Sequence, residues 1–442
     1  MRGLNHGVNT VMTKKAFSRR RFLGTAATVA VAPMLLPSKV WSAPVGPNSR
    51  LHIASIGMGT QNRGLTGNIL RREQCQVVAV CDVDRTRREA ARATVNERYA
   101  EATGRGEYRG CDAYNDFRSV LARSDVDAVV IATPDHWHAL ISIAAANAGK
   151  DIYCEKPLCQ SINEAKAVVN AVRRNRRVFQ VGSMQRSMSE FRRACELVRN
   201  GRLGRIYEIE VAVGGPSVWC DLPAETTEAA CDWNMWLGPT PLRPYNSELS
   251  PRGVHGHFPN WRNYVEFGGG MVTDWGAHHF DIAQWALGMD QSGPVEIIPA
   301  SEENATHGVR LVYANGTEVV HRNGNGVTIH GSEGKVYVNR GKFEATPEVL
   351  EEWRSGPGDV RLYESNDHIG DWLRSVETRT KPICDVEVGA RTVTVCHLVN
   401  LAYHHRERMR WDPVAQDFSQ WSGKSKWLDI PFPYRSPWKL ES

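Results

Sequence analysis

An uninterrupted apolar segment that runs into a glycine-rich turn constrains this chain most. LHIASIG, residues 51–57, leads directly into GMGTQNRG, residues 57–64. A strand without polar alternation is typical of a parallel sheet that is buried on both faces. The turn is followed by a helical segment toward Arg72. This strand–turn–helix unit predicts a dinucleotide-binding domain, because glycines allow a pyrophosphate to approach the N-terminus of the helix.

The same alternation continues along the chain. Further apolar strands are expected in residues 76–84, 126–134, 151–157 and 178–183, with helices over 86–104, 138–150 and 162–177 between them. Alternating strands and helices indicate right-handed crossovers and a doubly wound parallel sheet. From residue 205 the pattern changes to alternating strands with turns at Asn315-Gly316 and Glu333-Gly334, which are antiparallel signals. The fold class is therefore α/β, with two different sheets.

Four segments follow from this pattern. They are a signal peptide (1–43), a Rossmann dinucleotide-binding domain (44–175), a substrate and oligomerisation α/β domain (176–385), and a C-terminal helix and tail that pack back on the body (386–442).

The first segment has the features of an export signal. Ser18-Arg19-Arg20-Arg21-Phe22-Leu23 is a twin-arginine pattern, and the apolar run after it is too short to span a bilayer of about 30 Å. We therefore expect a periplasmic or otherwise exported protein without a stable membrane anchor, cleaved near Ser42. Seven of the 54 basic residues and none of the 49 acidic residues lie in residues 1–43. The remainder is close to neutral, which gives no electrostatic case for a nucleic-acid partner.

Candidate cofactor residues lie at the ends of the predicted parallel strands. Asp82, 25 residues after Gly57, is placed to bind the adenosine ribose hydroxyls, which favours NAD. NADP stays open because Arg85 is near, and a helix-capping role for Asp82 stays open as well. Asn62 stands where the fingerprint has its third glycine. His138 either reaches the nicotinamide ribose or packs at a helix start. The full set is Gly57, Gly59, Asn62, Arg63, Asp82, Thr133, Pro134, His138 and Glu155.

A lysine, a histidine and a carboxylate form the candidate catalytic set. Lys156 ends a strand of the cofactor domain in Glu155-Lys156-Pro157, and Asp274 and His278 are spaced to share one face of a helix. Oxidation of an alcohol needs a base for the hydroxyl proton and a cation for the developing alkoxide. A neutral histidine and a lysine supply these functions. Asp274 can orient the imidazole or bind a second hydroxyl, and a capping aspartate with a packed histidine is the structural alternative.

The motifs GMGTQNRG, CDVD, ATPDHWH, YCEKP and GGGMVTDWGAHHFDIAQW occur in an order that resembles the Gfo/Idh/MocA family, over roughly residues 50–410. The resemblance implies a Rossmann domain followed by an α/β domain whose open, mainly antiparallel sheet commonly mediates homo-oligomers. It also implies that Lys156 contacts the reacting hydroxyl, and that Asp274 and His278 hold the positions of the catalytic carboxylate and base. The missing third glycine is a departure from the pattern.

Substrate contacts are expected in the Trp-, Gly- and Pro-rich stretch 214–265, for which Trp236, His257 and Arg262 are the candidates. His255 and His257 with His278 and His279 have no recognised metal-ligand spacing, so we expect no metal. Whether Cys220 and Cys231 pair in an oxidising compartment is open.

Three functions remain as hypotheses. The first is an exported NAD(P)-dependent oxidoreductase for a hydroxyl of a sugar, cyclitol or glycoside. The second is a glycosidase that uses bound NAD for transient oxidation, and the third is a non-catalytic sugar-binding protein. Lys156 favours the first, because the resemblance implies that the glycosidase branch lacks this lysine.

Overall fold

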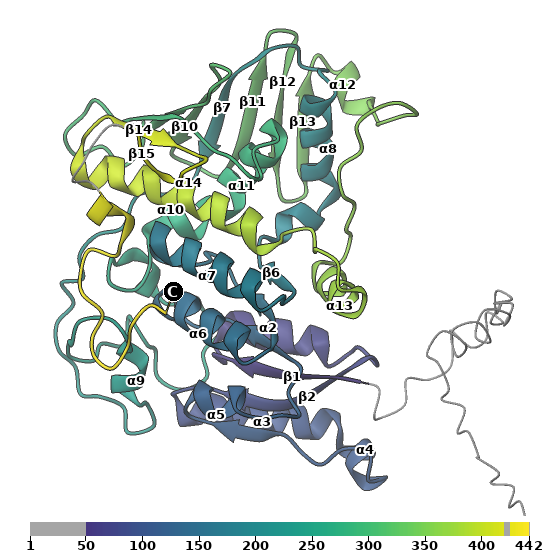
Figure 1. The fold of residues 1–442 in the computed structure, drawn as a ribbon, viewed down its shortest axis with the longest axis vertical. Helices are drawn as coiled ribbons and strands as arrows, with labels where there is room; N and C mark the ends of the chain where they lie inside the picture. The colour runs from purple at the N-terminus through teal and green to yellow at the C-terminus, as the bar shows by residue number, and fades with distance from the viewer. Residues whose placement is uncertain (1–49, 420–424, 442) are drawn as a thin grey trace, which may run out of the picture. The chain divides into compact units, whose positions relative to one another are not determined.

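The computed structural model describes residues 50–419 and 425–441. The twin-arginine pattern and the expected cleavage position near Ser42 lie outside these residues. The described part of the chain contains two sheets that belong to one compact unit (Figure 1).

The first sheet has six strands, all paired in parallel, in the order β3-β2-β1-β4-β5-β6. This is the strand order of a Rossmann fold, and it confirms the predicted doubly wound sheet. The strands are β1 (Leu51–Ile56), β2 (Cys75–Cys81), β3 (Asp112–Tyr114), β4 (Ala128–Ile131), β5 (Asp151–Cys154) and β6 (Phe179–Val181). The sixth strand lies beyond residue 175, the predicted end of this domain.

Separate hydrophobic cores cover the two faces of this sheet, which explains its continuous apolar strands. Along β1, Ile53 belongs to one core, whereas Ala54 and Ile56 belong to the other. The surrounding helices are α2 (Thr60–Ile69), α3 (Arg85–Arg98), α4 (Ala100–Gly104), α5 (Phe117–Leu121), α6 (Asp135–Asn147) and α7 (Ile162–Arg174). The helix expected over 86–104 is interrupted at Tyr99, whose hydroxyl binds the amide of Val77 and whose ring packs on Tyr108.

The second sheet has nine strands in the order β13-β12-β11-β7-β10-β9-β8-β14-β15. Its pairs are antiparallel except for β7 with β10, as expected for an open, mainly antiparallel sheet. Its strands are β7 (Ile206–Ala212), β8 (Glu296–Ile298), β9 (Arg310–Val312), β10 (Glu318–Arg322), β11 (Gly326–Gly331), β12 (Gly334–Asn339), β13 (Lys342–Thr346), β14 (Met409–Asp412) and β15 (Asp417–Phe418).

Helices cover one face of the nine-stranded sheet. Ile209 and Val211 of β7 are buried in the core beneath them, and Glu208 and Glu210, which alternate with these residues, point to the other, polar face. The covering helices are α8 (Ser189–Arg199), α11 (Gly276–Leu287) and α14 (Val386–His405), seen beside the sheet in Figure 1. The remaining helices are η3 (Met184–Ser187), α9 (Trp233–Leu237), η4 (Asn260–Asn263), α10 (Gly270–Asp274), α12 (Val349–Glu352), α13 (His368–Thr378) and η5 (Ser425–Leu428).

Two segments from the second half of the chain return to the first sheet. The loop between β7 and α10 binds the end of β2, where the amide of Asp232 donates to the Val83 carbonyl at 2.9 Å. The C-terminal tail places Trp438 against Trp137 of α6 and Phe117 of α5. Both segments therefore support the end of the parallel sheet at which cofactor residues were predicted.

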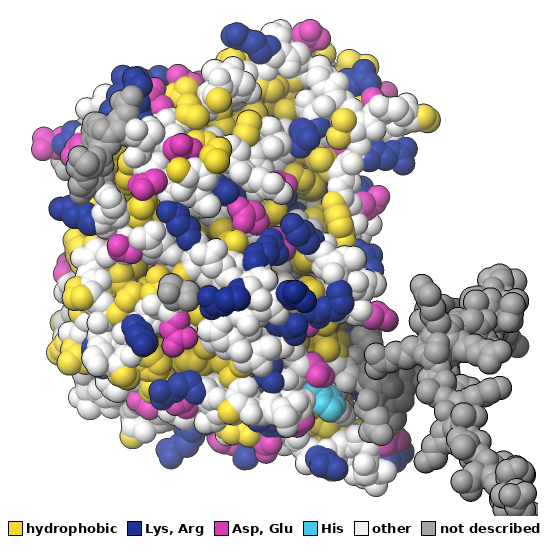
Figure 2. All heavy atoms as spheres, viewed as in Figure 1, with side chains coloured by type: hydrophobic (Ala, Val, Ile, Leu, Met, Phe, Trp, Pro, Cys, Tyr) yellow, Lys and Arg dark blue, Asp and Glu magenta, His cyan; other side chains and the backbone are white. Residues whose placement is uncertain are grey.

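The surface charge, the helices and the cysteines each bear on an expectation drawn from the sequence. Figure 2 shows basic and acidic side chains interspersed on the face in view. Among the described residues, no helix is both long and apolar enough to cross a membrane. Cys220 and Cys231 are free thiols that share one small apolar cluster without a bond between them.

Candidate active site

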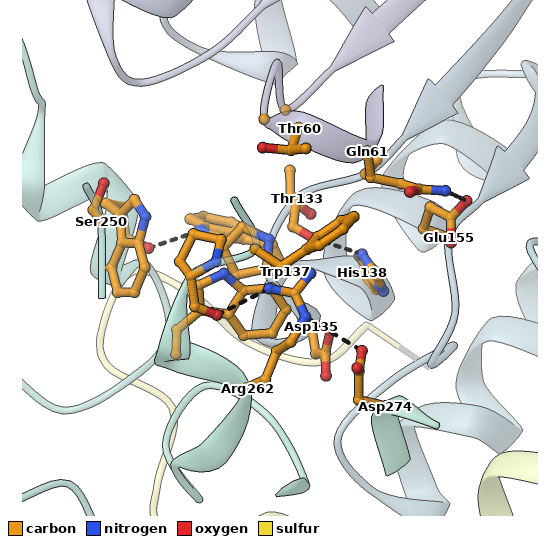
Figure 3. A pocket seen from close by; sticks show the side chains of 18 of the residues that line it. Thr60, Gln61, Thr133, Asp135, Trp137, His138, Glu155, Ser250, Arg262 and Asp274 are labelled. Carbon is orange, nitrogen blue, oxygen red and sulfur yellow. Dashed lines mark hydrogen bonds and ion pairs between the residues drawn. The ribbon is translucent and has the colours of Figure 1, made fainter. Parts of the chain in front are cut away.

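A cavity of about 450 Å³ opens at the carboxyl ends of the parallel strands. Its walls come from the glycine turn, the ends of β2, β4 and β5, the loop over residues 249–263, and helices α10 and α11 (Figure 3). Ligands of doubly wound sheets bind at this edge. The cavity therefore joins the predicted cofactor residues to the predicted catalytic residues.

The glycine turn leaves room for a bound dinucleotide. Gly57 has φ of +82°, and an added Cβ there would lie 2.8 Å from the Ala132 carbonyl and the Thr133 amide. Gly59 precedes α2 and has open space where a Cβ would stand. No side chain of the described residues caps α2, and its first turn holds no acidic residue. These uncapped amide groups and the helix dipole suit a pyrophosphate, so this turn fits a dinucleotide.

Asn62 and Arg63 do not line the cavity. The buried Asn62 amide donates to the Ile56 carbonyl at 3.2 Å and accepts from the Thr66 hydroxyl at 3.2 Å, so it ties α2 to the end of β1. Arg63 binds the His255 carbonyl. Thr60 and Gln61, which sequence reasoning passed over, line the cavity beside Gly57 and Gly59. Their place directly after Gly59 was the available signal.

Asp82 lies at the end of β2 and lines the cavity with Asn115 and Ser250. Its carboxylate accepts from the Met58 amide at 2.6 Å and the Asp84 amide at 2.8 Å, so it holds the glycine turn. Burial raises its pKa. Asp84, not Asp82, caps α3 by accepting from the Arg87 amide. The helix-capping role that was considered for Asp82 is therefore filled by Asp84.

The segment after β4 supplies three of the predicted residues and one that was missed. Thr133, Pro134 and His138 line the cavity. Both ring nitrogens of the buried His138 lie near carbonyls, at 2.7 Å from Pro157 and 2.9 Å from Thr133, and burial lowers its pKa to about 4. His138 thus links two cavity loops. The missed residue is Asp135, whose pKa is raised well above its usual value by burial and then by Asp274.

Lys156 and Asp274 form an ion pair between the two halves of the chain. Lys156 Nζ lies 2.7 Å from Asp274 Oδ1 and 2.9 Å from its carbonyl oxygen. Beside them, Gln61 donates to Glu155 at 2.8 Å. Burial opposes the charge of Asp274, but Lys156 and then Arg262 outweigh it and lower the carboxyl pKa below its usual value. Asp274 is therefore a fixed anion that orients the ammonium group.

His278 faces the same cavity from the next helix. The sequence predicted one helix through Asp274 and His278, but α10 ends at Asp274 and α11 begins at Gly276. Trp275 between them keeps helical dihedral angles, so both side chains still reach the cavity. His278 is 4% exposed, and within the described residues its Nδ1 has no hydrogen-bond partner. Burial, then Lys156 and Arg340, lower its pKa well below the usual value, so the ring is neutral near pH 7.

The three candidate substrate residues have different surroundings. Arg262 lines the cavity, with Nε 3.3 Å from Asp274 Oδ1 and its guanidinium carbon 4.2 Å from the centre of the Trp261 ring. Trp236 also lines it but is 4% exposed and stacks on Trp233. His257 does not line the cavity; its carbonyl accepts from Thr60, and its neighbour His255 lines the cavity instead. Figure 3 shows Arg262, Asp135 and Asp274 close together.

Groups that suit a metal lie elsewhere in the described part of the chain. Glu208, Glu210 and His330 come together on the polar face of the nine-stranded sheet. Arg322 pairs with both carboxylates there, at 3.5 Å and 3.2 Å. The four histidines considered from the sequence do not form such a group among the described residues.

Comparison with known proteins agrees with both halves of this arrangement. Residues 51–183 match the Gfo/Idh/MocA family model described as an oxidoreductase family, NAD-binding Rossmann fold. Residues 215–440, about half of the chain, match the model described as an oxidoreductase family, C-terminal alpha/beta domain.

Two curated relatives match shorter stretches. Levoglucosan dehydrogenase from Pseudarthrobacter phenanthrenivorans is 42% identical over 92 residues, which is 21% of this chain and 24% of that protein. Inositol 2-dehydrogenase 4 from Saccharopolyspora erythraea is 34% identical over 160 residues, which is 36% of this chain and 44% of that protein. The alignments thus span less than half the length of either relative.

The similarity of fold extends over most of the chain. The WlbA dehydrogenase from Bordetella pertussis, solved in complex with NADH and UDP-GlcNAcA, gives a TM-score of 0.59 at 18% identity. The superposition covers 82% of this chain and 99% of that chain. At this identity the comparison shows a shared fold.

Proposed function

This chain belongs to the Gfo/Idh/MocA oxidoreductase family, and from that premise we propose that it is an NAD-dependent dehydrogenase for a sugar, cyclitol or glycoside hydroxyl. The observation that carries the proposal is the meeting of Lys156, Asp274 and His278 in one cavity that the glycine turn also lines. The names of the two curated relatives, a levoglucosan and an inositol dehydrogenase, support this substrate class.

Different groups around one carbon handle the hydride, the proton and the developing negative charge. NAD, when bound, accepts the hydride from the carbinol carbon. The neutral imidazole of His278 takes the hydroxyl proton as the carbonyl forms. Lys156, held by Asp274, stabilises the negative charge that develops on the oxygen. Proton, hydride and the new C=O bond account for all atoms of the oxidation.

Asp82 supports NAD as the preferred form of the cofactor. A carboxylate at the end of the second strand accepts hydrogen bonds from the ribose hydroxyls and repels a 2′-phosphate. Gly57, Gly59, Thr133, Pro134, His138 and Glu155 complete the proposed cofactor contacts, and all of them line the cavity.

We also propose export by the twin-arginine route and assembly into homo-oligomers. The support for export is the Arg19-Arg20-Arg21 pattern in a segment without acidic residues. Replacing Arg19 and Arg20 with Lys should leave the protein in the cytoplasm, and unchanged export would contradict this. For assembly, the support is the polar face of the nine-stranded sheet, which the described helices leave open.

The decisive experiment begins with mass spectrometry of the cofactor that purified protein releases on denaturation. Single-turnover reduction of bound NAD is then followed by absorbance across sugars, cyclitols and aryl glycosides. Reduction by a hydroxylated substrate is the expected result. Cleavage of aryl glycosides without net reduction would replace the dehydrogenase with the NAD-dependent glycosidase. Sugar binding by cofactor-free protein would favour a non-catalytic role.

A further inference from the structure

A hairpin of the second sheet carries an arginine into the cavity. Arg340 and Gly341 form the two-residue turn between β12 and β13, and Gly341 has φ of +68°. The turn is fixed on both sides, since Asn339 Oδ1 accepts from the Arg340 amide at 2.8 Å and Glu190 accepts from the Gly341 amide at 2.9 Å. Arg340 is therefore held on a rigid element rather than on a mobile loop.

The guanidinium lies beside the proposed base. Its carbon is 4.8 Å from the centre of the Trp275 ring, a cation–π distance. Gln185, in the amide orientation that satisfies both of its ends, accepts from Arg340 Nε at 3.3 Å and donates to the His278 carbonyl at 3.1 Å. The guanidinium of Arg340 thus stacks on Trp275 and donates from Nε to Gln185. Among the described residues, the two terminal nitrogens of the guanidinium have no hydrogen-bond partner.

No carboxylate of the described residues lies within ion-pair distance of Arg340. Of the other cations that line the cavity, Lys156 and Arg262 share Asp274, and Arg87 pairs with Asp84. Desolvation lowers the pKa of Arg340, the charges of Glu155 and Asp274 oppose this shift, and burial raises the pKa of Asp135 and Glu155. Arg340 is therefore a cation of the cavity wall that has no ion-pair partner among the described residues. The glycine turn proposed for the NAD pyrophosphate belongs to the first sheet, whereas Arg340 belongs to a hairpin of the second sheet.

We propose that Arg340 binds a carboxylate of the substrate, so that the hydroxyl oxidised by this enzyme belongs to a sugar acid. The inference rests on the proposed dehydrogenase function and narrows its substrate class. A planar fork with two free nitrogens matches the two oxygens of a carboxylate. The rigid hairpin fixes the distance between this anion and the hydroxyl that faces Lys156 and His278.

The test compares matched neutral and acidic sugars in wild type and Arg340→Gln. The pairs are glucose with glucuronate and galactose with galacturonate, and glucose 6-phosphate represents a phosphate. In wild type, kcat/KM for the uronate should exceed that for its neutral partner by at least about tenfold. Arg340→Gln should lower the uronate value by roughly 10–100-fold, the scale of a charge-assisted hydrogen-bonded pair, and change the neutral value little. Lys342→Gln removes a cation from the same hairpin outside the cavity and is the matched control.

Thermal stabilisation by glucuronate gives a readout that does not need turnover. The melting temperature of NAD-loaded wild type and Lys342→Gln should rise with glucuronate, and that of Arg340→Gln should not. If no sugar reduces NAD but this Arg340-dependent shift persists, the dehydrogenase function fails and the carboxylate site stands. If neutral sugars reduce NAD and Arg340→Gln affects both members of a pair equally, the carboxylate site is wrong. Preference for the phosphate sugar, absence of any uronate effect or loss of NAD binding in Arg340→Gln would also overturn it.

Discussion

At the scale of single residues, the cavity separates a fixed ion pair from a neutral base. Asp274 is already engaged by Lys156 and Arg262, so it is unsuited to accept the substrate proton. Within the part of the chain that the structure describes, His278 has no carboxylate contact, and its ring stays neutral through burial and nearby cations. For the proposed dehydrogenase, this arrangement favours His278 as the proton acceptor and Asp274 as a positioning residue.

The first prediction concerns His278. His278→Ala should lower turnover by at least roughly a hundredfold, the scale for loss of a positioned acid–base group. NAD binding should survive, because the histidine belongs to α11 rather than to the parallel-sheet domain. Since its pKa is lowered, the ring stays unprotonated as pH falls to 6.5, and the wild-type rate should decline only below that pH. Single-turnover NAD reduction from pH 5 to 8 measures both effects.

His307→Ala, in an exposed loop, is the control for loss of an imidazole. Lys156→Ala should also lose at least roughly a hundredfold, but with weaker cofactor binding as well, since Lys156 follows β5. A wild-type rate in His278→Ala would rule out the histidine as the base.

The second prediction concerns Asp82. Asp82→Ala should weaken binding of NAD more than that of NADP, because it removes the ribose acceptor and the repulsion of the 2′-phosphate. Part of the loss will affect both cofactors, since Asp82 also holds the Met58 amide. Asp82→Asn keeps an acceptor for that amide and removes the charge, so it should shift the NAD/NADP affinity ratio with less general damage. Titration of both cofactors measures the ratio, and an unchanged ratio would leave Asp82 a purely structural role.

At the scale of elements, α7 shows how a cap connects distant segments. Ser161 and Glu164 form a reciprocal capping box at its N-terminus. The Glu164 carboxyl also accepts from the Tyr434 hydroxyl at 2.6 Å, which ties the C-terminal tail to the helix. Burial raises the pKa of Glu164 to about 7. The folded protein therefore binds a proton here at a pH where the unfolded chain has lost it.

The third prediction follows from this linkage. A carboxyl whose pKa is raised in the folded state stabilises the fold at low pH, and that contribution is lost as pH rises from about 4.5 toward 7. Glu164→Gln supplies a neutral acceptor at every pH. Its melting temperature relative to wild type should therefore be higher at pH 8 than at pH 5. Thermal unfolding at both pH values tests this, with the exposed Glu352→Gln as control; an equal difference at both values would contradict it.

At the scale of the whole molecule, the C-terminal tail supports the cofactor domain from outside. Trp438 packs on Trp137 at a centroid distance of 4.7 Å and lies under Arg118. Trp137 lines the cavity and donates to the Trp236 carbonyl at 3.0 Å. The tail, α6 and the loop around α9 are thus linked through one indole.

The fourth prediction tests that link. Trp438→Ala should destabilise the protein by about 2 kcal/mol, because it removes a half-buried aromatic side chain and its ring pairs. The melting temperature should fall by about 2–4 °C, and NAD should bind more weakly as α6 loosens. Thermal unfolding and cofactor titration measure these effects. Trp219→Ala, at a tryptophan that is 59% exposed, should change neither property, and an unaffected Trp438→Ala protein would show that the tail is dispensable.

The sequence alone predicted the parallel sheet, the glycine turn and the set Lys156, Asp274 and His278. Each of these rests on local order: an apolar strand, a positive φ that favours glycine, a residue at a strand end, or a four-residue helical spacing. Such features depend on neighbours in the chain and are therefore readable from it.

Only the tertiary structure decided which residues share the cavity. Arg340, more than 180 residues from Lys156, reaches it through a hairpin of the other sheet, and no local pattern marks it. Asn62 does not face the cavity, because its amide binds the Ile56 carbonyl. His257 binds Thr60 through its carbonyl, and its ring does not line the cavity. Chain distance does not limit contacts between packed elements, so the direction of each side chain is set by what packs against it.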